Sequence, residues 1–500
     1  MNTDKRIKLP QKAKIGLYTV GLKAYWPQFE GLRERIIEYV NFIEKKLSPY
    51  AEIYNYGLVD CSEEGHKAGE WFKKNDVDLV FCHAGTYVSS DAVLPVHQIC
   101  TAPAIVLNLQ PTTRVNYAET WTGEWLAHCG ACPVPEISNA FERSNIPFRV
   151  ISGLLGLDYT PKISVADENT AHRPEAKKAY EEMIDWCKAA GVKRTMRNAR
   201  FGFLGSNFHG MLDMYSDHTM IQAQMGVHIE IIEMCDLNER MKNITDREID
   251  AKLEEIKEMF QISGDSKADP IAKKPTEEQL RWSARVAVAQ ERLVRDYNLD
   301  ALVYYYHSVA GNPYQEIQGG FIVGHSLLTA NGIPCAGEAD TKTGLAMKIC
   351  DILNTGGSYC EIVTADYEDG TILLGHDGPF HIKISNGKPI LRGMGLYHGK
   401  QGTGVSVEAK VKTGPITMLG VTQTGKGKLR MIISEGESTD AEIMQVGNTQ
   451  THVKFPVDID TYYNNWFRHA PTHHWAMSIG HNAKLFEKVA QMLGCEYVIL

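Results

Sequence analysis

Apolar and polar positions along the first 160 residues follow a pattern that predicts strands and helices in turn. Amphipathic stretches such as FEGLRERIIEYVNFIEKKL separate short apolar runs of the kind found in buried strands: AKIGLYTVG, AEIYNYGLV, VDLVFCHAG, PAIVLNLQ and FRVISGLLG. Strands that alternate with helices form parallel sheets with crossover helices. The pattern therefore predicts a doubly wound, Rossmann-like α/β domain over residues 1–175.

The same alternation resumes after the polar stretch ADENTAHRPEAK. It predicts strands at ARFGFLG, HIEIIEM and ALVYYYH, with helices near residues 174–190, 216–225 and 276–297. We expect a second doubly wound α/β domain over residues 176–330. The first strand is followed by TVGLKAYW rather than by a GxGxxG turn, so the sequence predicts no dinucleotide site.

Beyond residue 360 the pattern changes to short alternating strands with frequent glycine turns. Segments such as EIVTADYEDGTILLGHDG and GVSVEAKVKTGPITMLGVTQTGKGKLRMIISEGE are typical of an antiparallel sheet that closes on itself. A last helix, HNAKLFEKVAQMLG, and a last strand, CEYVIL, follow. The fold class is therefore α/β, with a C-terminal antiparallel β-barrel-like domain over residues 331–500.

Composition and charge exclude several classes of protein. The net charge of -9 is spread along the chain without a long basic cluster, which argues against a nucleic-acid partner. No apolar run reaches the ~18 residues of a membrane span, and the charged N-terminus does not resemble a signal peptide, so we expect a cytoplasmic protein without a membrane partner. Only Cys129 and Cys132 among the eleven cysteines are closely spaced, and we interpret all of them as reduced thiols.

The densest candidate chemistry lies in residues 304–347, where Glu316, Glu338 and Asp340 stand among glycine turns and apolar runs. The pattern predicts a helix over Phe321–Ala330, a short buried strand ending at Ala336, and another helix from Thr341. Glu338 and Asp340 thus fall at a strand exit, where α/β proteins place ligand-binding groups. In the alternative interpretation, Asp340 only caps the following helix and Glu338 favours its positive end.

Histidines add to this set in the C-terminal part. His376 ends an apolar strand in LLGHDGPFH, and His473 and His474 lie in a predicted loop, APTHHW, before the last helix. Each one taken singly is typical of a hydrogen-bonded structural histidine. Together with the carboxylates they form a donor set that suits Mn²⁺, Mg²⁺ or Co²⁺.

At these residues the chain resembles the metal-dependent L-arabinose and L-fucose isomerases, and most closely their arabinose/fucose isomerase-like branch. The motifs GNPYQEI, SLLTANGIPCAGE, LLGHDGPFH, VKTGPIT, SEGES and APTHH occur in the order of that family. The resemblance covers most of residues 300–500. Over the first 200 residues it is limited to the layout and a few positions.

The resemblance implies an aldose–ketose isomerase whose divalent metal, Mn²⁺ or another such as Mg²⁺ or Co²⁺, is held by two acids and by C-terminal histidines. By position the first acid is Glu316. The second is Glu338 in the arabinose-type pattern and Asp340 in the fucose-type pattern, and this chain has both. His376 matches the arabinose-type histidine, and His474 is preferred over its neighbour. The hexamers of the family, with active sites at subunit interfaces, imply a homo-oligomer.

The chemistry of an isomerase explains why such residues are needed. One proton moves between C2 and C1 of the sugar, a divalent ion stabilises the enediolate, and two carboxylates divide the proton transfers. Glu316 and Glu338 are the predicted catalytic pair. The family has a Phe-Glu-Asp run where this chain reads Tyr306-His307-Ser308, so the assignment of Glu316 assumes a loop insertion.

Several residues are predicted to bind the sugar. Lys23 and Trp26 follow the first strand, His128 matches a His-Gly segment of the family, and His209 and His473 complete the set. Lys23 stands where relatives have a neutral amide, so the sugar is L-arabinose, L-fucose or a related one, including a C6-acidic, for example sulfonated, hexose. The alternative is a surface lysine. Two rival functions are a sugar-binding protein without catalysis and a metal-dependent hydrolase or lyase.

Overall fold

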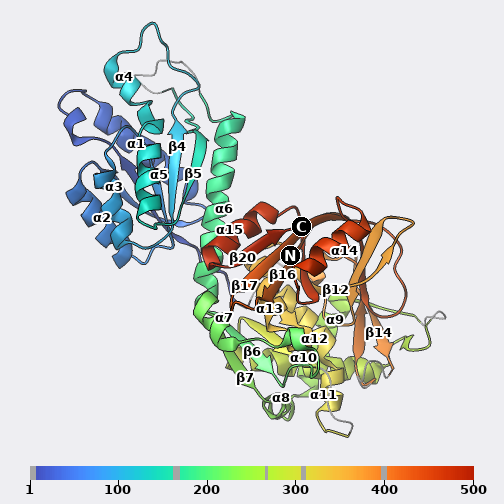
Figure 1. Cartoon of the computed structure of the whole chain (residues 1–500). Coiled ribbons are helices and arrows are strands. Elements are labelled where there is room, and N and C mark those ends of the chain that lie inside the picture. The colour runs from blue at the N-terminus through green and yellow to red at the C-terminus, as the bar shows by residue number, and fades with distance from the viewer. Residues whose placement is uncertain (1–6, 161–168, 265–268, 306–310, 396–401) are drawn as a thin grey trace. The chain divides into compact units, whose positions relative to one another are not determined.

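The structure is a computed structural model of the whole chain (Figure 1), and it describes residues 7–160, 169–264, 269–305, 311–395 and 402–500. Contacts between Cα atoms divide the chain into two compact units. One is Gln11–Arg194, and the other is Thr195–Leu500 together with residues 7–10.

Five parallel strands form the sheet of the Gln11–Arg194 unit, in the order β2-β1-β3-β4-β5. The strands are β1 (Lys14–Val20), β2 (Glu52–Val59), β3 (Leu79–His83), β4 (Ala104–Gln110) and β5 (Phe148–Leu154). The helices are η1 (Lys23–Tyr25), α1 (Leu32–Leu47), α2 (Ser62–Lys74), α3 (Ser90–Ile99), α4 (Thr122–Leu126), η2 (Cys129–Ala131), α5 (Val134–Arg143) and α6 (Pro174–Met196).

Burial in this unit follows the sequence pattern. All five positions of β3 are buried, as expected for a central strand covered on both faces. Helix α1 buries Ile36, Tyr39, Val40 and Ile43, which recur at helical spacing along one side. The strand order reverses between β1 and β3, and ligands of open α/β sheets bind at the carboxyl ends of strands flanking such a point. Helix η1 follows β1 at that end.

A second parallel sheet opens the other unit, in the order β11-β10-β6-β7. Its strands are β6 (Arg200–Leu204), β7 (His228–Ile232), β10 (Ala301–Tyr304) and β11 (Cys335–Ala336). The helices of this part are η3 (Leu212–Met214), α7 (His218–Met225), α8 (Met234–Met241), α9 (Asp246–Met259), α10 (Glu277–Asp296), α11 (Gln315–Gly319), α12 (Phe321–Ala330), η4 (Gly337–Ala339) and α13 (Thr341–Ile352). Helix α12 is buried at all ten positions, which explains why its sequence is apolar all round.

An antiparallel barrel follows. Six strands pair in the ring β16-β19-β12-β13-β18-β17, and pairing between β16 and β17 closes it. They are β12 (Gly356–Asp366), β13 (Thr371–His376), β16 (Gly414–Gln423), β17 (Leu429–Ser438), β18 (Thr449–Lys454) and β19 (His474–Ile479). Strand β20 (Glu496–Ile499) pairs in parallel with β17, and η5 (Ile382–Ile384), α14 (Ile459–Arg468) and α15 (Ala483–Leu493) complete this part. The predicted mixed α/β fold with parallel sheets and a C-terminal antiparallel barrel is confirmed.

A small mixed sheet combines strands from two parts of the chain. It joins β14 (Ile390–Met394) to β15 (Val405–Glu408), β8 (Gln261–Ile262) and β9 (Ala272–Lys273). All eleven cysteines are free. Among the described residues, no helix is both long and apolar enough to cross a bilayer.

The domain boundaries expected at residues 175 and 330 stay predictions. Helix α6 runs across the first of them, and β11, which follows the second, completes the parallel sheet by pairing with β10.

Candidate metal centre

Glu338 stands at the carboxyl end of β11 in an unusual backbone conformation. Its φ is 59° and that of Ala339 is 58°, so two successive residues with side chains adopt the left-handed region. Such residues cost of order 1–3 kcal/mol each and persist where the surroundings hold them. The hydroxyl of Tyr359 donates to the carbonyl of Gly337, and the N–H of Phe208 donates to that of Glu338. This turn directs a carboxylate that is only 5% exposed toward the barrel.

The barrel brings two histidines to this carboxylate. His376 ends β13 and His474 begins β19, and strand β12 pairs with both, so that Glu361 is opposite Gly375 on one side and His474 on the other. The predicted position of His376 at a strand end is confirmed. The prediction of a loop at His474 was wrong, because this residue already pairs with β12 and is buried.

The three side chains converge on one point. Oε1 of Glu338 lies 3.8 Å from Nε2 of His376, and Oε2 lies 3.6 Å from Nε2 of His474. One ligand atom from each residue lies within 4.8 Å of the others, and all three residues are buried. Ligand atoms about 2.1 Å from a shared ion lie about 3 Å apart, so these groups are close to the arrangement of a metal site.

A carboxylate lies beside Nδ1 of each imidazole. Nδ1 of His376 lies 3.2 Å from Asp377 Oδ1, and Nδ1 of His474 lies 3.1 Å from Asp340 Oδ2. Metal-binding histidines commonly donate their second ring N–H to such a group, which fixes the tautomer and aims the other nitrogen. In each histidine Nε2 is the ring nitrogen that lies near Glu338, and Nε2 of His474 also lies 2.9 Å from the Tyr359 hydroxyl.

Asp340 uses both carboxylate oxygens in bonds within the protein. Oδ1 accepts from the N–H of Thr343, Oδ2 accepts from its hydroxyl at 2.6 Å, and Oδ2 also faces His474. Asp340 therefore caps α13, as the alternative interpretation expected, and orients His474 at the same time.

Burial and local charges set the protonation of the cluster. Burial raises the pKa of the Glu338 carboxyl, although nearby His376 and His473 oppose the rise. Burial lowers the pKa of His474 to about 3, so this imidazole is neutral at pH 7. Burial opposes ionisation of Asp340, but the hydrogen bond from His474 and the charge of Lys342 lower its pKa to about 2. A neutral imidazole oriented by an ionised carboxylate presents its lone pair to a cation.

A cavity of about 560 Å³ opens beside the cluster. Glu338, Glu361, His376 and His473 line it, with apolar walls from Phe208, Met211, Val363, Leu373, Met444 and Val446. Asp377, Asn448, Thr449 and Gln450 also line it. A cavity with apolar walls and several polar groups is typical of a small-molecule site.

Glu316 does not join this cluster. It is exposed on α11, where its carbonyl accepts hydrogen bonds from the Trp282 indole at 2.8 Å and the Thr403 hydroxyl at 2.9 Å. It lines a different hollow, of about 860 Å³, with Arg281 and Arg285. The segment Tyr306-His307-Ser308, on which its assignment depended, lies outside the described residues.

His473 lies near the cluster, whereas His209 lies in a different hollow. His473 lines the cavity next to Glu338, as expected of a substrate-binding group. His209 stacks on Phe208 and lies 3.5 Å from the Tyr305 hydroxyl, in a separate hollow of about 750 Å³.

The remaining predicted substrate residues belong to the Gln11–Arg194 unit. The Trp26 indole donates to Asp60 at 2.7 Å, and His128 lies between the Thr112 hydroxyl and the carbonyl of Glu124. Lys23 is exposed on η1. Hydrogen bonds from Lys67 and Tyr56 chiefly lower the pKa of Glu64, and the charge of Lys23 adds to that effect, so a carboxylate lies near this cation.

Sequence reasoning missed several groups. Asp377 directly follows His376, and that adjacency was the available signal. Glu361 lies in an alternating strand like any surface glutamate, and Asp213 lies in a loop, so neither carried a signal before the fold placed them beside His473.

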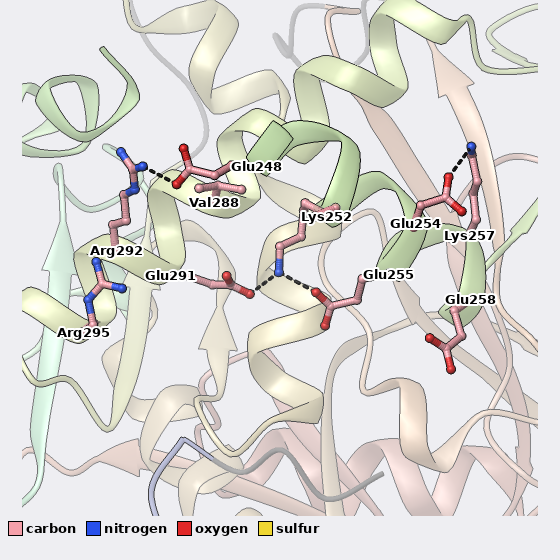
Figure 2. Close-up of a pocket in the computed structure, with 11 residues that line it drawn as sticks. Glu248, Lys252, Glu254, Glu255, Lys257, Glu258, Val288, Glu291, Arg292 and Arg295 are labelled. Atoms are coloured by element: carbon pink, nitrogen blue, oxygen red, sulfur yellow. Dashed lines mark hydrogen bonds and ion pairs between the residues drawn. The ribbon is translucent and has the colours of Figure 1, made fainter. Parts of the chain in front are cut away.

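Another hollow, of about 850 Å³ between α9 and α10, is more strongly charged (Figure 2). Most of its charges pair with one another: Lys252 bridges Glu255 and Glu291, Glu254 pairs with Lys257, and Glu248 pairs with Arg292. This surface holds two helices together and offers no group comparable to the buried cluster.

Comparison with known proteins agrees with the geometry. The family model of the L-arabinose isomerase central domain matches residues 200–356, and that of the L-fucose isomerase C-terminal domain matches residues 388–500. The first match contains Glu338, the second contains His473 and His474, and His376 lies between them.

Curated relatives include L-arabinose isomerases from Herpetosiphon aurantiacus, 24% identical over 64% of this chain and 63% of the relative, and from Nocardioides sp., 22% identical over 63% and 62%. The matched region thus spans less than two thirds of these relatives. A periplasmic solute-binding protein from Actinobacillus succinogenes with bound D-allose aligns to 62% of this chain and 84% of its own at 11% identity and a TM-score of 0.17. From the two successive family matches and the curated relatives, the chain belongs to the arabinose/fucose isomerase superfamily.

Proposed function

We propose that this protein is a metal-dependent aldose–ketose isomerase. The observation that carries the proposal is the convergence of Glu338, His376 and His474 beside a cavity that Glu338 and His376 line. The relatives named L-arabinose isomerase support the reaction class.

The donor set fits a divalent ion. One carboxylate and two imidazoles form a hard-to-borderline site that suits Mn²⁺, with Mg²⁺ or Co²⁺ as alternatives. Glu338, His376 and His474 would hold the ion. Asp340 would orient His474 rather than bind the ion, because both of its oxygens already accept hydrogen bonds. This arrangement corresponds to the arabinose-type pattern.

The residues around the cavity suit proton transfer within one sugar. When bound, the ion polarises the sugar carbonyl and stabilises negative charge on the enediolate. Glu338 would remove and return the proton at carbon, because it is the carboxylate of the cluster that lines the cavity, and burial raises the pKa of its carboxyl. A second carboxylate must exchange protons with the hydroxyls, and Glu361 lines the cavity whereas Glu316 does not. We therefore propose Glu338 with Glu361 as the acid–base pair, in place of Glu338 with Glu316.

The proposed substrate is L-arabinose, L-fucose or a related sugar. The C6-acidic alternative depends on Lys23 as an anion anchor. Glu63 and Glu64, in the first turn of α2, add negative charge near this lysine, which makes the site less suited to an anionic sugar. The test compares L-arabinose, L-fucose and a C6-sulfonated hexose as substrates of the wild type and of Lys23→Gln. If the substitution lowers kcat/KM only for the sulfonated sugar, Lys23 binds the anionic group and the C6-acidic substrate is supported.

We also propose a cytoplasmic homo-oligomer whose subunits share active sites, with Lys23, Trp26 and His128 as substrate contacts, and a doubly wound arrangement around each parallel sheet. The interfacial sites follow from the family resemblance. Light scattering on the purified chain tests the assembly, and a monomer with full activity would contradict it.

The function itself is tested with a panel of aldoses incubated with Mn²⁺ and followed by NMR for ketose signals. We expect conversion of at least one L-sugar, complete loss after chelation, and recovery with Mn²⁺. Full activity in metal-free protein, or release of a cleaved product instead of a ketose, would overturn the proposal.

A further inference from the structure

We infer that Asp213 is a positioning residue that holds His473 beside Glu361 and so builds a subsite for a sugar hydroxyl next to the metal centre. This inference rests on the proposed function, since it assigns a substrate group to the same cavity. Asp213 lies in η3, in the loop that follows β6, and is 260 residues distant from His473 in sequence.

Asp213 holds His473 by two contacts. Its Oδ2 accepts from the backbone N–H of His473 at 3.2 Å and lies 2.5 Å from Nδ1 of the ring. One oxygen that binds both the main chain and the ring restricts rotation of the imidazole. Asp340 holds Nδ1 of His474 in the same way, whereas Asp377 Oδ1 lies 3.2 Å from Nδ1 of His376 without the geometry of a hydrogen bond.

A buried lysine fixes the loop that carries Asp213. Nζ of Lys342 donates to the carbonyls of Met214 and Tyr215 and to the hydroxyl of Ser216, at 2.9 to 3.3 Å. Lys342 is 1% exposed and follows Asp340 on α13. An ammonium has three N–H donors, and a buried one is stable only where they are satisfied. The loop of Asp213 is therefore anchored to α13, the helix that Asp340 caps.

This anchoring leaves Nε2 of His473 facing the cavity. It lies 4.0 Å from Oε2 of Glu361 and 4.0 Å from Oε2 of Glu338. These separations are too long for direct hydrogen bonds. A hydroxyl oxygen about 2.8 Å from both Nε2 of His473 and Oε2 of Glu361 would see these two atoms at an angle of about 90°. One hydroxyl can therefore hydrogen-bond to both groups. Glu361 accepts, and a hydroxyl both donates and accepts, which a polyhydroxy sugar supplies.

A second metal ion is the competing occupant, because Glu361, His473 and His474 also offer ligand atoms within 4.8 Å of one another. His474 cannot serve two ions, since Asp340 occupies its Nδ1 and only Nε2 remains. Glu361 and His473 are also partly exposed on the cavity wall, whereas Glu338, His376 and His474 are buried. The geometry therefore favours one ion and one hydroxyl subsite.

The test compares Asp213→Ala, His473→Ala and the double variant, each loaded with Mn²⁺, on a converted sugar and its monodeoxy analogues. We expect each single variant to lower kcat/KM about tenfold to a hundredfold, mostly through KM, the usual scale for losing one hydrogen-bonded contact. The double variant should lose little more than either single one. For the analogue that lacks the recognised hydroxyl, the kcat/KM of the wild type should be low, and Asp213→Ala should not lower it further. For every other analogue, Asp213→Ala should lower kcat/KM as much as it does for the parent sugar.

Metal analysis and a matched control complete the experiment. We expect one Mn²⁺ per chain in the wild type and in all three variants. Asp217→Ala, four residues further on, removes the N-cap of α7 and should change neither KM nor the metal content. Two ions in the wild type, loss of metal in Asp213→Ala, or an equal loss for every analogue would overturn the inference.

A binding measurement separates this inference from the proposed function. If the wild type converts no sugar, the isomerase proposal fails, and calorimetry with L-arabinitol as an open-chain polyol still tests the subsite. Weaker binding in Asp213→Ala but not in Asp217→Ala supports it, and equal binding in both overturns it.

Discussion

Oδ2 of Asp340 lies 3.1 Å from Nδ1 of His474, while the same side chain caps α13 through Thr343. One carboxylate thus fixes a helix start and the tautomer of a candidate metal ligand. The two roles can be separated, because the chain contains a second cap of the same design: Asp458 caps α14 and accepts from the N–H and the hydroxyl of Thr461, and among the described residues it forms no hydrogen bond with a histidine.

Asp340→Asn should weaken Mn²⁺ binding by tenfold to a hundredfold, the usual effect of removing a group that orients a metal ligand. Asparagine can still cap the helix, so stability should fall only slightly. Asp458→Asn is the control, and its Mn²⁺ affinity should equal that of the wild type by isothermal titration. If both variants bind Mn²⁺ equally well, Asp340 is only a helix cap; if Asp340→Asn binds none, it is itself a ligand, as in the fucose-type pattern.

Glu338→Gln and Glu316→Gln should behave differently. Glu338→Gln removes a ligand and the proposed base, and we expect kcat to fall at least a hundredfold together with loss of the thermal stabilisation that Mn²⁺ gives. Glu316→Gln should keep its Mn²⁺, because the side chain lies in another hollow. Metal analysis and Tm with and without Mn²⁺ decide the matter. Loss of Mn²⁺ from Glu316→Gln would show that Glu316 reaches the centre after all.

His325 should make the protein sensitive to acid. Its ring is fully buried in α12 between Tyr304 and Phe321, neither ring nitrogen has a hydrogen-bond partner among the described residues, and burial lowers its pKa to about 3 from an ordinary 6.5. The unfolded chain therefore binds a proton between these pH values that the folded chain does not. The contribution of neutral His325 to the free energy of unfolding is therefore fully present above pH 6.5. It is lost as the pH drops toward 3, and the loss is about 3 kcal/mol at pH 4.

His325→Leu should remove that part of the pH dependence and leave the Tm at pH 7 unchanged or higher. Thermal unfolding between pH 7 and pH 4 measures the effect, with exposed His66→Leu as the control. A loss of Tm on acidification as steep as in the wild type would contradict the assignment.

Asp78 should be a strong stabilising residue of the Gln11–Arg194 unit. Its Oδ2 accepts from Nε of Arg194 at 2.6 Å and from the N–H of Lys14 at 2.8 Å, with 4% of the Asp78 side chain and 9% of the Arg194 side chain exposed. Removing one partner of a buried pair costs about 3–5 kcal/mol, whereas a surface pair contributes about 0–1 kcal/mol.

We therefore expect Asp78→Ala to lower the free energy of unfolding in urea by about 3 kcal/mol or more. Asp158→Ala, which removes a surface pair with Lys46 at 3.8 Å, should have little effect. Equal effects of the two substitutions would show that burial does not strengthen the contact.

Local structure around the candidate site could be predicted from the sequence alone. The helix over Phe321–Ala330, the strand ending at Ala336, the helix beginning at Thr341 and the strand ending at His376 all match the structure. Apolar periodicity and glycine turns act over a few residues, so they can be read without knowledge of distant contacts. Glu338, Asp340 and His376 were therefore found at the ends of the correct elements, whereas His474 was predicted in a loop and Glu361 was missed.

Which of these residues meet was decided by the tertiary structure. Pairing of β12 with both β13 and β19 places Glu361 near His473 and His474. The loop that Lys342 holds places Asp213 next to His473, 260 residues away in sequence. The same packing leaves Glu316 in another hollow. Glu361, which lies about as far from Glu338 along the sequence as Glu316 does, lines the cavity instead. Composition and periodicity describe only residues that are close in sequence. Strand pairing in a closed barrel joins segments about a hundred residues apart, so the ligands are positioned relative to one another only when the barrel forms.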